Sequence, residues 1–210
     1  MLERFRQFWT NLLSPLADFM LRIGIKPDWV TIVGTLGASG AALWFYPRGE
    51  FMVGTFVIAA FVFSDLLDGY MARKSGQSSK WGAFLDSTLD RVADGAIFGG
   101  IALWYSGEGD SQTYTALAIL CLLMGAVTSY TRARAEGLGM TAKGGIAERA
   151  DRLVAILTMT GFSGIFGEPL LLEVTLWALA VASTITVIQR MIIVHKQAFG
   201  NPMPPAPPVE

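Results

Sequence analysis

Apolar residues in this chain gather into six blocks, each close to the length that crosses a lipid bilayer. This pattern excludes collagen, coiled-coil and disordered classes. The predicted spans are Trp29–Tyr46, Phe51–Ala72, Trp81–Tyr105, Thr113–Tyr130, Leu153–Gly167 and Leu170–Val194. The chain is therefore predicted to be an all-α integral membrane protein with six transmembrane helices.

The two ends of the chain carry different patterns. Between Leu2 and Leu21, apolar residues recur at helical spacing among charged ones, which predicts an interfacial amphipathic helix and not a signal peptide. The segment Asn201–Glu210 is rich in proline and is typical of a disordered tail. The predicted organisation is an amphipathic juxtamembrane helix at 1–27, a six-helix transmembrane domain at 28–197 and a Pro-rich disordered tail at 198–210.

Composition supports a membrane class and narrows the chemistry. Hydrophobic residues make up 52% of the 210 positions and charged residues 16%, against about 25% charged in a soluble domain. The single cysteine cannot form an intrachain disulfide, and the single histidine excludes any site that needs two imidazoles. A net charge of −1 gives no reason to expect nucleic acid. The remaining catalytic groups are carboxylates, arginine, lysine and hydroxyls.

Lysine and arginine are distributed unevenly between the two sides of the predicted membrane domain. Of the 16 lysines and arginines, 14 lie on one side, and Arg48 is the only one in the loops on the opposite side. Short positively charged loops stay in the cytoplasm. We therefore expect a multi-pass protein of the plasma membrane, with both termini and any site near the second and third spans facing the cytoplasm.

Carboxylates inside the apolar chain are the strongest chemical signal. The second and third spans contain Asp65, Asp68, Asp86, Asp90 and Asp94. Ionisable groups at such depth are costly, so they normally face the bundle interior or an aqueous cavity and have a function.

Helical spacing groups these residues onto two faces. The first face carries Asp65, Asp68, Gly69 and Ala72, and the second carries Gly82, Asp86 and Asp90. If the two faces meet, four carboxylates converge, and the small residues leave room for a ligand. Converging like charges need cations, and oxygen ligands without histidine or thiolate favour Mg²⁺, Mn²⁺ or Ca²⁺. Two such ions would hold a diphosphate and polarise its phosphorus.

The same residues resemble the signature of the CDP-alcohol phosphotransferase family. The run Asp65-Leu-Leu-Asp68-Gly69-Tyr-Met-Ala72-Arg73, with Gly82, Asp86 and Asp90 following at the required spacing, matches it at every fixed position. This resemblance implies a membrane enzyme with six transmembrane helices, usually a homodimer. Such an enzyme transfers the phosphatidyl group of a CDP-linked lipid to an alcohol and releases CMP, so residues 28–197 would be the catalytic domain.

The resemblance also implies roles for individual positions. Asp65, Asp68 and Asp86, with Asp90 beside them, form the metal set for two divalent ions, Mg²⁺ or Mn²⁺. Asp90 is in addition the implied catalytic general base on the acceptor hydroxyl, since a carboxylate one turn beyond Asp86 can reach it without being locked into the metal shell. The implied nucleotide and CDP-lipid positions are Asp28, Thr31, Gly69, Ala72, Arg73 and Gly82.

Two of these acidic residues have alternative interpretations. Asp28 is equally compatible with capping the first span as an N-cap residue. Asp94 lies outside the signature, and we expect a structural role for it, such as pairing with Arg91 or another cation.

Arginines after the fourth span bear on the acceptor. Arginines at the end of the fourth span, the start of the fifth and the end of the last would suit a second phosphate if they converge, because guanidinium groups bind phosphate in a bidentate way. Their sequence neighbourhoods are similar to those of actinobacterial phosphatidylinositol phosphate synthases. That similarity implies CDP-diacylglycerol and inositol phosphate as substrates. It also implies acceptor-phosphate binding by Ser129, Arg132, Arg152 and Arg190.

Other functions fit parts of the pattern. A phosphatidylglycerophosphate synthase would use glycerol 3-phosphate, an acceptor that also bears a phosphate. An ion-coupled transporter could use the aspartates as an ion relay, but inverted repeats and broken midplane helices are not evident. A purely structural membrane protein would gain nothing from four carboxylates on facing helices.

Overall fold

The structure, a computed structural model, describes residues 14–62, 64–76 and 79–200, and of Asp65 and Asp68 it describes the backbone only. All regular structure in these residues is helical, which confirms the predicted all-α class. Residues 14–22 are helical. The elements that follow are α2 (Pro27–Phe45), the short 3-10 helix η1 (Tyr46–Arg48), α3 (Phe51–Val62), α4 (Ser64–Lys74), α5 (Lys80–Ser106), α6 (Gln112–Glu136), α7 (Arg149–Phe166) and α8 (Leu170–Gly200). The predicted features at residues 1–13 and 201–210 lie outside the described residues.

The helix ends follow local sequence chemistry. Pro27 begins α2 at a position where its missing N–H costs nothing. Ser79 and Ser111 cap α5 and α6, and each side-chain oxygen accepts an N–H from the first turn. Gly167 ends α7 in the left-handed conformation, with φ of 71°.

The length of the helices and their apolar surface indicate that the chain is a membrane protein. Three described segments are long and apolar enough to cross a bilayer: Pro27–Arg48, Gln112–Glu136 and Leu170–Gly200. Large apolar side chains such as Trp29 and Phe56 are more than half exposed, as expected on a lipid-facing surface. The predicted span Phe51–Ala72 covers α3 and most of α4, and α5 is 27 residues long but carries charged residues in its first half.

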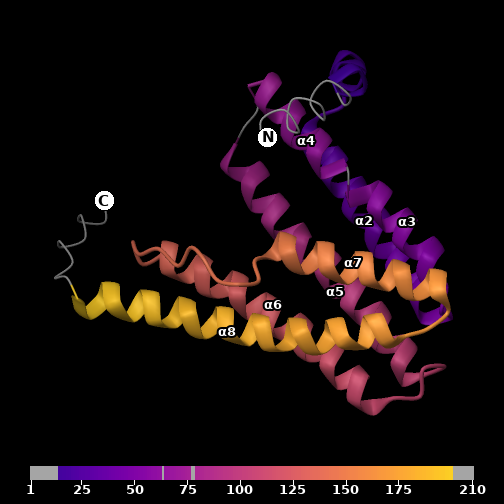
Figure 1. Cartoon of the computed structure of the whole chain (residues 1–210). Coiled ribbons are helices and arrows are strands. Elements are labelled where there is room, and N and C mark those ends of the chain that lie inside the picture. The colour runs from indigo at the N-terminus through magenta and orange to yellow at the C-terminus, as the bar shows by residue number, and fades with distance from the viewer. Residues whose placement is uncertain (1–13, 63, 77–78, 201–210) are drawn as a thin grey trace, which may run out of the picture.

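Six of the described helices pack in a closed ring. Helix α2 packs against α3 and α5, and α5 packs against α6. The ring continues from α6 to α8, from α8 to α7 and from α7 back to α3 (Figure 1). Its centre contains the fully buried side chains of Ile97, Ile101, Ile156, Leu172 and Leu176. The ring brings α5, α6, α7 and α8 together, although α5 and α8 are far apart in the sequence.

Helix α4 lies on α2 (Figure 1). Its Leu67 and Met71 are buried with Ala17 of the N-terminal helix. Lys74 donates to both carboxylate oxygens of Asp18, at 2.5 and 2.6 Å, and this hydrogen bond raises the pKa of Lys74. Residues 14–22 therefore pack on the side of α4 that, by helical spacing, is opposite its signature residues.

Helix α8 is longer than the sequence pattern predicted. It continues through Gly200, whereas the predicted span ends at Val194 and the predicted tail begins at residue 198. Residues 195–200 contain no proline, and the first helix-breaking residue is Pro202. The extension matters because Gln197 contacts the loop between α6 and α7, where its side chain accepts the Thr141 N–H at 3.0 Å.

Candidate active site

Three carboxylates follow one face of α5. Asp86, Asp90 and Asp94 are each one turn apart, and Ser79 fixes the start of the helix by accepting the Gly82 N–H at 2.9 Å. Asp86 is exposed, Asp90 is half-buried and Asp94 is 8% exposed. The acidic face therefore runs from the open end of α5 into the bundle.

Arginines meet the two inner carboxylates. Arg149, the first residue of α7, places Nη2 2.9 Å from Asp90 Oδ1 and donates from Nε to Asp94 Oδ1 at 3.3 Å. Arg91 lies 3.6 Å from a carboxylate oxygen of both Asp90 and Asp94. The expected pairing of Asp94 with Arg91 or another cation is confirmed. Within the described part of the chain, Asp86 makes no such pair.

The other half of the acidic signature lies on α4. Asp65 and Asp68 are one turn apart on this helix, but the prediction that their side chains bind metal concerns atoms outside the described residues. Helices α4 and α5 both pack on α2, which thus sets the distance between them. Among the described side chains, no group of three or more His, Cys, Asp and Glu forms a ready metal site. The structure therefore leaves the metal set as a prediction.

Two of the predicted nucleotide positions meet where α2 and α5 begin. A Cβ added at Gly82 would lie 3.6 Å from Asp28 Oδ1, in ordinary contact. The N-cap of α2 is Lys26 and Asp28 lies in the first turn, so the alternative N-cap role of Asp28 is wrong. In that turn its carboxylate interacts favourably with the positive end of the helix dipole.

The remaining predicted nucleotide positions lie on α2 and α4. Thr31 is buried, and its hydroxyl donates to the Pro27 carbonyl at 3.3 Å. Arg73 folds back along α4, because a Cβ added at Gly69 would lie 3.3 Å from its Nη1. Ala72 is half-buried on the same helix. The guanidinium of Arg73 thus lies over the signature glycine of α4.

A cavity of about 540 Å³ opens beside Asp90, between α5, α6, α7 and α8. Its charged and hydroxyl-bearing lining residues are Ser87, Asp90, Arg91, Thr128, Ser129, Arg132, Glu136, Glu148, Arg149 and Arg190. The structure therefore brings the predicted base together with three of the four predicted acceptor-phosphate residues. Two arginines of the lining, Arg91 and Arg149, were not among the predicted substrate-binding residues, although Arg91 was expected to pair with Asp94. The available signals were the position of Arg91 next to Asp90 and that of Arg149 three residues before Arg152.

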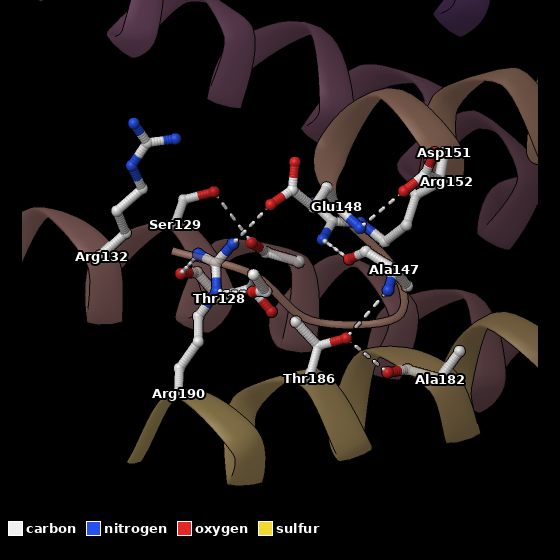
Figure 2. Close-up of polar contacts among 12 residues, drawn as sticks. Thr128, Ser129, Arg132, Ala147, Glu148, Asp151, Arg152, Ala182, Thr186 and Arg190 are labelled. Atoms are coloured by element: carbon white, nitrogen blue, oxygen red, sulfur yellow. Dashed lines mark hydrogen bonds and ion pairs between the residues drawn. The ribbon is translucent and has the colours of Figure 1, made fainter. Parts of the chain in front are cut away.

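Arg132 and Ser129 reach this cavity from α6. Arg132 is exposed, its Nε donates to Glu136 Oε1 at 3.0 Å, and Figure 2 shows its guanidinium directed away from Arg190. An exposed pair of this kind contributes only about 0.3–0.5 kcal/mol. The Ser129 hydroxyl donates to the Gly125 carbonyl at 3.2 Å. Both side chains can therefore turn toward a ligand at little cost.

Arg190 and Arg152 are buried and bonded to backbone carbonyls (Figure 2). Arg190 donates to the Thr128 carbonyl at 2.7 Å and to the Gly144 carbonyl at 3.0 Å. Arg152 is 2% exposed, lies behind the cavity wall and donates to the Ala147 carbonyl at 3.3 Å. Carbonyl partners are neutral, so they fix these guanidinium groups without cancelling their charge. Arg190 also forms an ion pair with the exposed carboxylate of Glu148, at 3.8 Å. The arginines therefore gather around the cavity, as predicted. Their guanidinium groups do not all converge, because that of Arg132 points outward.

Comparisons with known proteins agree with the signature. A family model described as CDP-alcohol phosphatidyltransferase matches residues 25–188. A Streptomyces avermitilis protein named phosphatidylinositol phosphate synthase is 55% identical over 199 residues, covering 92% of this chain and 82% of that protein. A Cutibacterium acnes protein of the same name is 47% identical over 203 residues, covering 93% of this chain and 98% of that protein.

Solved structures of a protein with the same name are also similar to this chain. The Mycobacterium tuberculosis phosphatidylinositol phosphate synthase with CDP-DAG bound matches with a TM-score of 0.85 and 41% identity, covering 88% of this chain and 94% of that chain. The structure of that enzyme in complex with manganese and citrate matches with a TM-score of 0.84 and 41% identity, covering 87% and 88%.

Proposed function

Because the chain belongs to the CDP-alcohol phosphatidyltransferase family, we propose that it transfers the phosphatidyl group of CDP-diacylglycerol to inositol phosphate. The products are phosphatidylinositol phosphate and CMP. The observation that carries this proposal is the cavity that holds Asp90 on one wall and guanidinium groups on the others. The names of the Streptomyces and Cutibacterium relatives support the choice of acceptor.

The cavity suits a small phosphorylated polyol. Arg132, Arg149 and Arg190 line it, and guanidinium groups bind phosphate through paired hydrogen bonds. We assign the acceptor phosphate to Ser129, Arg132 and Arg190, with Arg152 acting from behind the wall. Asp90 lies in the same cavity, where an acceptor hydroxyl would come within reach of a general base.

The acidic signature suits divalent metal ions. Its donors are all carboxylate oxygens, which Mg²⁺ and Mn²⁺ prefer, and the exposed Asp86 stands at the open end of α5. The one thiol is unsuitable, because Cys121 is buried and donates to the Leu176 carbonyl. We assign two ions, Mg²⁺ or Mn²⁺, to Asp65, Asp68, Asp86 and Asp90, and the manganese complex of the M. tuberculosis enzyme supports a divalent ion. Bound ions would neutralise the diphosphate and stabilise departing CMP.

The chain's own residues then account for the transfer step. Asp90 takes the proton of the acceptor hydroxyl, and the hydroxyl oxygen forms a bond to the β-phosphorus of CDP-diacylglycerol. The bond from that phosphorus to the bridging oxygen breaks, and CMP leaves with the electron pair. Direct attack needs no covalent enzyme intermediate, and neither the buried Cys121 nor His195, near the end of α8, lines the cavity.

The nucleotide end of the donor is assigned to the junction of α2, α4 and α5. Asp28 and Gly82 meet there, and Arg73 lies over Gly69. Small residues at positions 69, 72 and 82 leave the backbone accessible to cytidine, and Arg73 brings a positive charge to the diphosphate. Thr31 completes the set as a buried residue of α2.

The membrane arrangement belongs to the same proposal. We propose six spans, a plasma-membrane location and cytoplasmic termini, because the lysines and arginines lie mainly on the side where the cavity opens. A homodimer, implied by the family resemblance, stays a prediction.

An acceptor assay tests this function. Purified protein in mixed micelles receives CDP-diacylglycerol, a divalent metal and either inositol phosphate or glycerol 3-phosphate, and CMP release is measured. We expect metal-dependent release with inositol phosphate. Release with glycerol 3-phosphate alone would reverse the acceptor assignment, and ion flux without any CMP would favour a transporter.

A further inference from the structure

The loop between α6 and α7, residues 137–148, is fastened to α8 by a residue that neither the signature nor the predicted acceptor set includes. Thr186 is fully buried on α8. Its hydroxyl accepts the Ala147 N–H at 3.0 Å and donates to the Ala182 carbonyl at 2.8 Å (Figure 2). We propose that Thr186 is a positioning residue that sets the wall of the acceptor cavity by holding this loop, an inference that rests on the proposed function.

The bond to Thr186 lies immediately before the residues that form the wall. Ala147 precedes Glu148, the N-cap of α7, and Arg149, its first helical residue, and both of these line the cavity. Ala147 is held at both of its backbone polar groups, since its N–H donates to Thr186 and its carbonyl accepts from Arg152 Nη1 at 3.3 Å. A shift of this peptide would therefore move the start of α7 and carry Glu148 and Arg149 with it.

The loop backbone is also shaped to fit Thr186. Gly145 has φ of 127°, a region that residues with a Cβ rarely adopt, and a Cβ there would lie 2.2 Å from Thr186 Cγ2. Its neighbour Gly144 has φ of 98°, and the Gly144 carbonyl accepts from Arg190. Two consecutive glycines thus let the loop lie directly on α8. The close approach at Gly145 and the hydrogen bond at Ala147 therefore both hold residues 145–147 against Thr186.

A matched control lies on the same helix. Thr184 is half-buried, and its hydroxyl donates to the Ala180 carbonyl of its own helix at 2.7 Å. Thr184→Val and Thr186→Val are the same chemical change, and each removes a hydroxyl bond inside α8. Only Thr186→Val also leaves the Ala147 N–H without its acceptor.

The kinetic test compares Thr186→Val, Thr186→Ser and Thr184→Val with the parent enzyme in the CMP-release assay. We expect Thr186→Val to raise the KM for inositol phosphate about tenfold, because a buried N–H loses its partner. The KM for CDP-diacylglycerol should stay within about twofold, as should both KM values of Thr186→Ser, which keeps the hydroxyl, and of Thr184→Val. An equal rise in both KM values, or a Thr186→Val enzyme that matches Thr184→Val, would overturn the proposal.

A second pair of variants covers the case in which Thr186→Val fails to fold. Gly145→Ala should raise the same KM, because its Cβ meets Thr186 Cγ2, and adding Thr186→Ser removes that atom. We expect the double variant to recover part of the loss, the remainder reflecting backbone strain at the alanine. No recovery in the double variant would contradict the fit between loop and helix.

A readout without substrate separates this inference from the proposed function. Hydrogen–deuterium exchange of residues 144–150 should be faster in Thr186→Val than in Thr184→Val. Equal exchange in the two variants would contradict the positioning role of Thr186. If the parent enzyme releases CMP only with glycerol 3-phosphate, the acceptor assignment fails. The KM comparison then applies to that acceptor, and the positioning role stands or falls separately.

Discussion

On α5, the two inner carboxylates of the site, Asp90 and Asp94, are paired with guanidinium groups, whereas the buried guanidinium groups of Arg152 on α7 and Arg190 on α8 are bonded mainly to carbonyls. Asp90 and Asp94 share Arg149 and Arg91 as cationic partners. Arg190, in contrast, donates to two carbonyls, and its one carboxylate partner among the described residues is the exposed Glu148, at 3.8 Å. Both arrangements lower the cost of burying a charge.

This difference decides which ligands each side of the site can attract. We call the aspartates of α4 and α5 the acidic half of the site, and Arg132, Arg152 and Arg190 the basic half. Arg149 and Arg91 offset the charge of Asp90 and Asp94, so in the acidic half we assign the metal ions mainly to Asp86 and the α4 aspartates at the open end, and the base role to Asp90. Arg152 and Arg190 are held mainly by neutral carbonyls, and the carboxylate that pairs with Arg190 is exposed to solvent, so the basic half remains attractive to an anion such as a phosphate. The cavity between the halves therefore presents a base on one side and positive charge on the other.

The largest expected effect comes from removing the base on the acidic half. Asp90→Asn should lower turnover by about 100-fold to 10,000-fold, the range for loss of a general base. Binding of CDP-diacylglycerol should be largely kept, because the metal set retains three carboxylates. CMP release and lipid binding are the measurements. Full activity in Asp90→Asn would remove the base assignment.

Asp94→Asn is the matched control for that variant. It makes the same chemical change one turn further along α5, and Arg149 keeps its contact with Asp90. Its effect on turnover should be less than about tenfold, in line with loss of one partner from a network. A loss as large as that of Asp90→Asn would mean that the pairing itself carries the catalytic effect.

The next effect concerns the open end of the acidic half. Asp68→Ala should shift the divalent titration of activity to about tenfold higher metal or more, because a carboxylate ligand is lost. A titration of CMP release against Mg²⁺ and Mn²⁺ measures the shift. An unchanged titration would contradict the assignment of Asp68 to the metal set.

On the basic half, a buried guanidinium should matter to one substrate only. Arg152→Ala leaves the Ala147 carbonyl without its donor and removes a charge behind the cavity, so the KM for inositol phosphate should rise about tenfold. The KM for CDP-diacylglycerol should change far less. Arg48→Ala is the control, since Arg48 lies in η1, which follows the end of α2 opposite to Asp28, and does not line the cavity. An equal effect on both KM values would leave the phosphate pocket without support.

Prediction from sequence succeeded where helical spacing alone fixes the geometry. Asp86, Asp90 and Asp94 lie one turn apart because they are four residues apart, and Asp94 pairs with Arg91, three residues earlier, as expected. The all-helical class follows in the same way from the apolar blocks. These are local properties, and no knowledge of packing is needed to find them.

The sequence does not identify which residues pair where two distant segments meet. Arg149 bonds to Asp94, 55 residues earlier in the sequence, and Thr186 accepts from Ala147, 39 residues away. A threonine in an apolar helix carries no sign of such a partner. The direction of Arg132 was likewise beyond the pattern, because the pair with Glu136 competes with the cavity for the same guanidinium.

The smallest expected effect follows from that competition and sharpens the contrast between buried and exposed arginines. Arg132→Ala removes one of the guanidinium groups assigned to the acceptor phosphate, but an exposed one, and charge pairs exposed to water contribute little, so the KM for inositol phosphate should rise only about twofold to fivefold. The rise should shrink at high salt, because exposed charges are screened and the buried pair of Arg152 and Ala147 is not. KM values at low and high ionic strength for Arg132→Ala and Arg152→Ala measure this directly. If Arg132→Ala proved as damaging as Arg152→Ala at both salt concentrations, the contact between Arg132 and the phosphate would have to be as well shielded from water as the buried pair of Arg152 and Ala147, and burial would no longer rank the arginines.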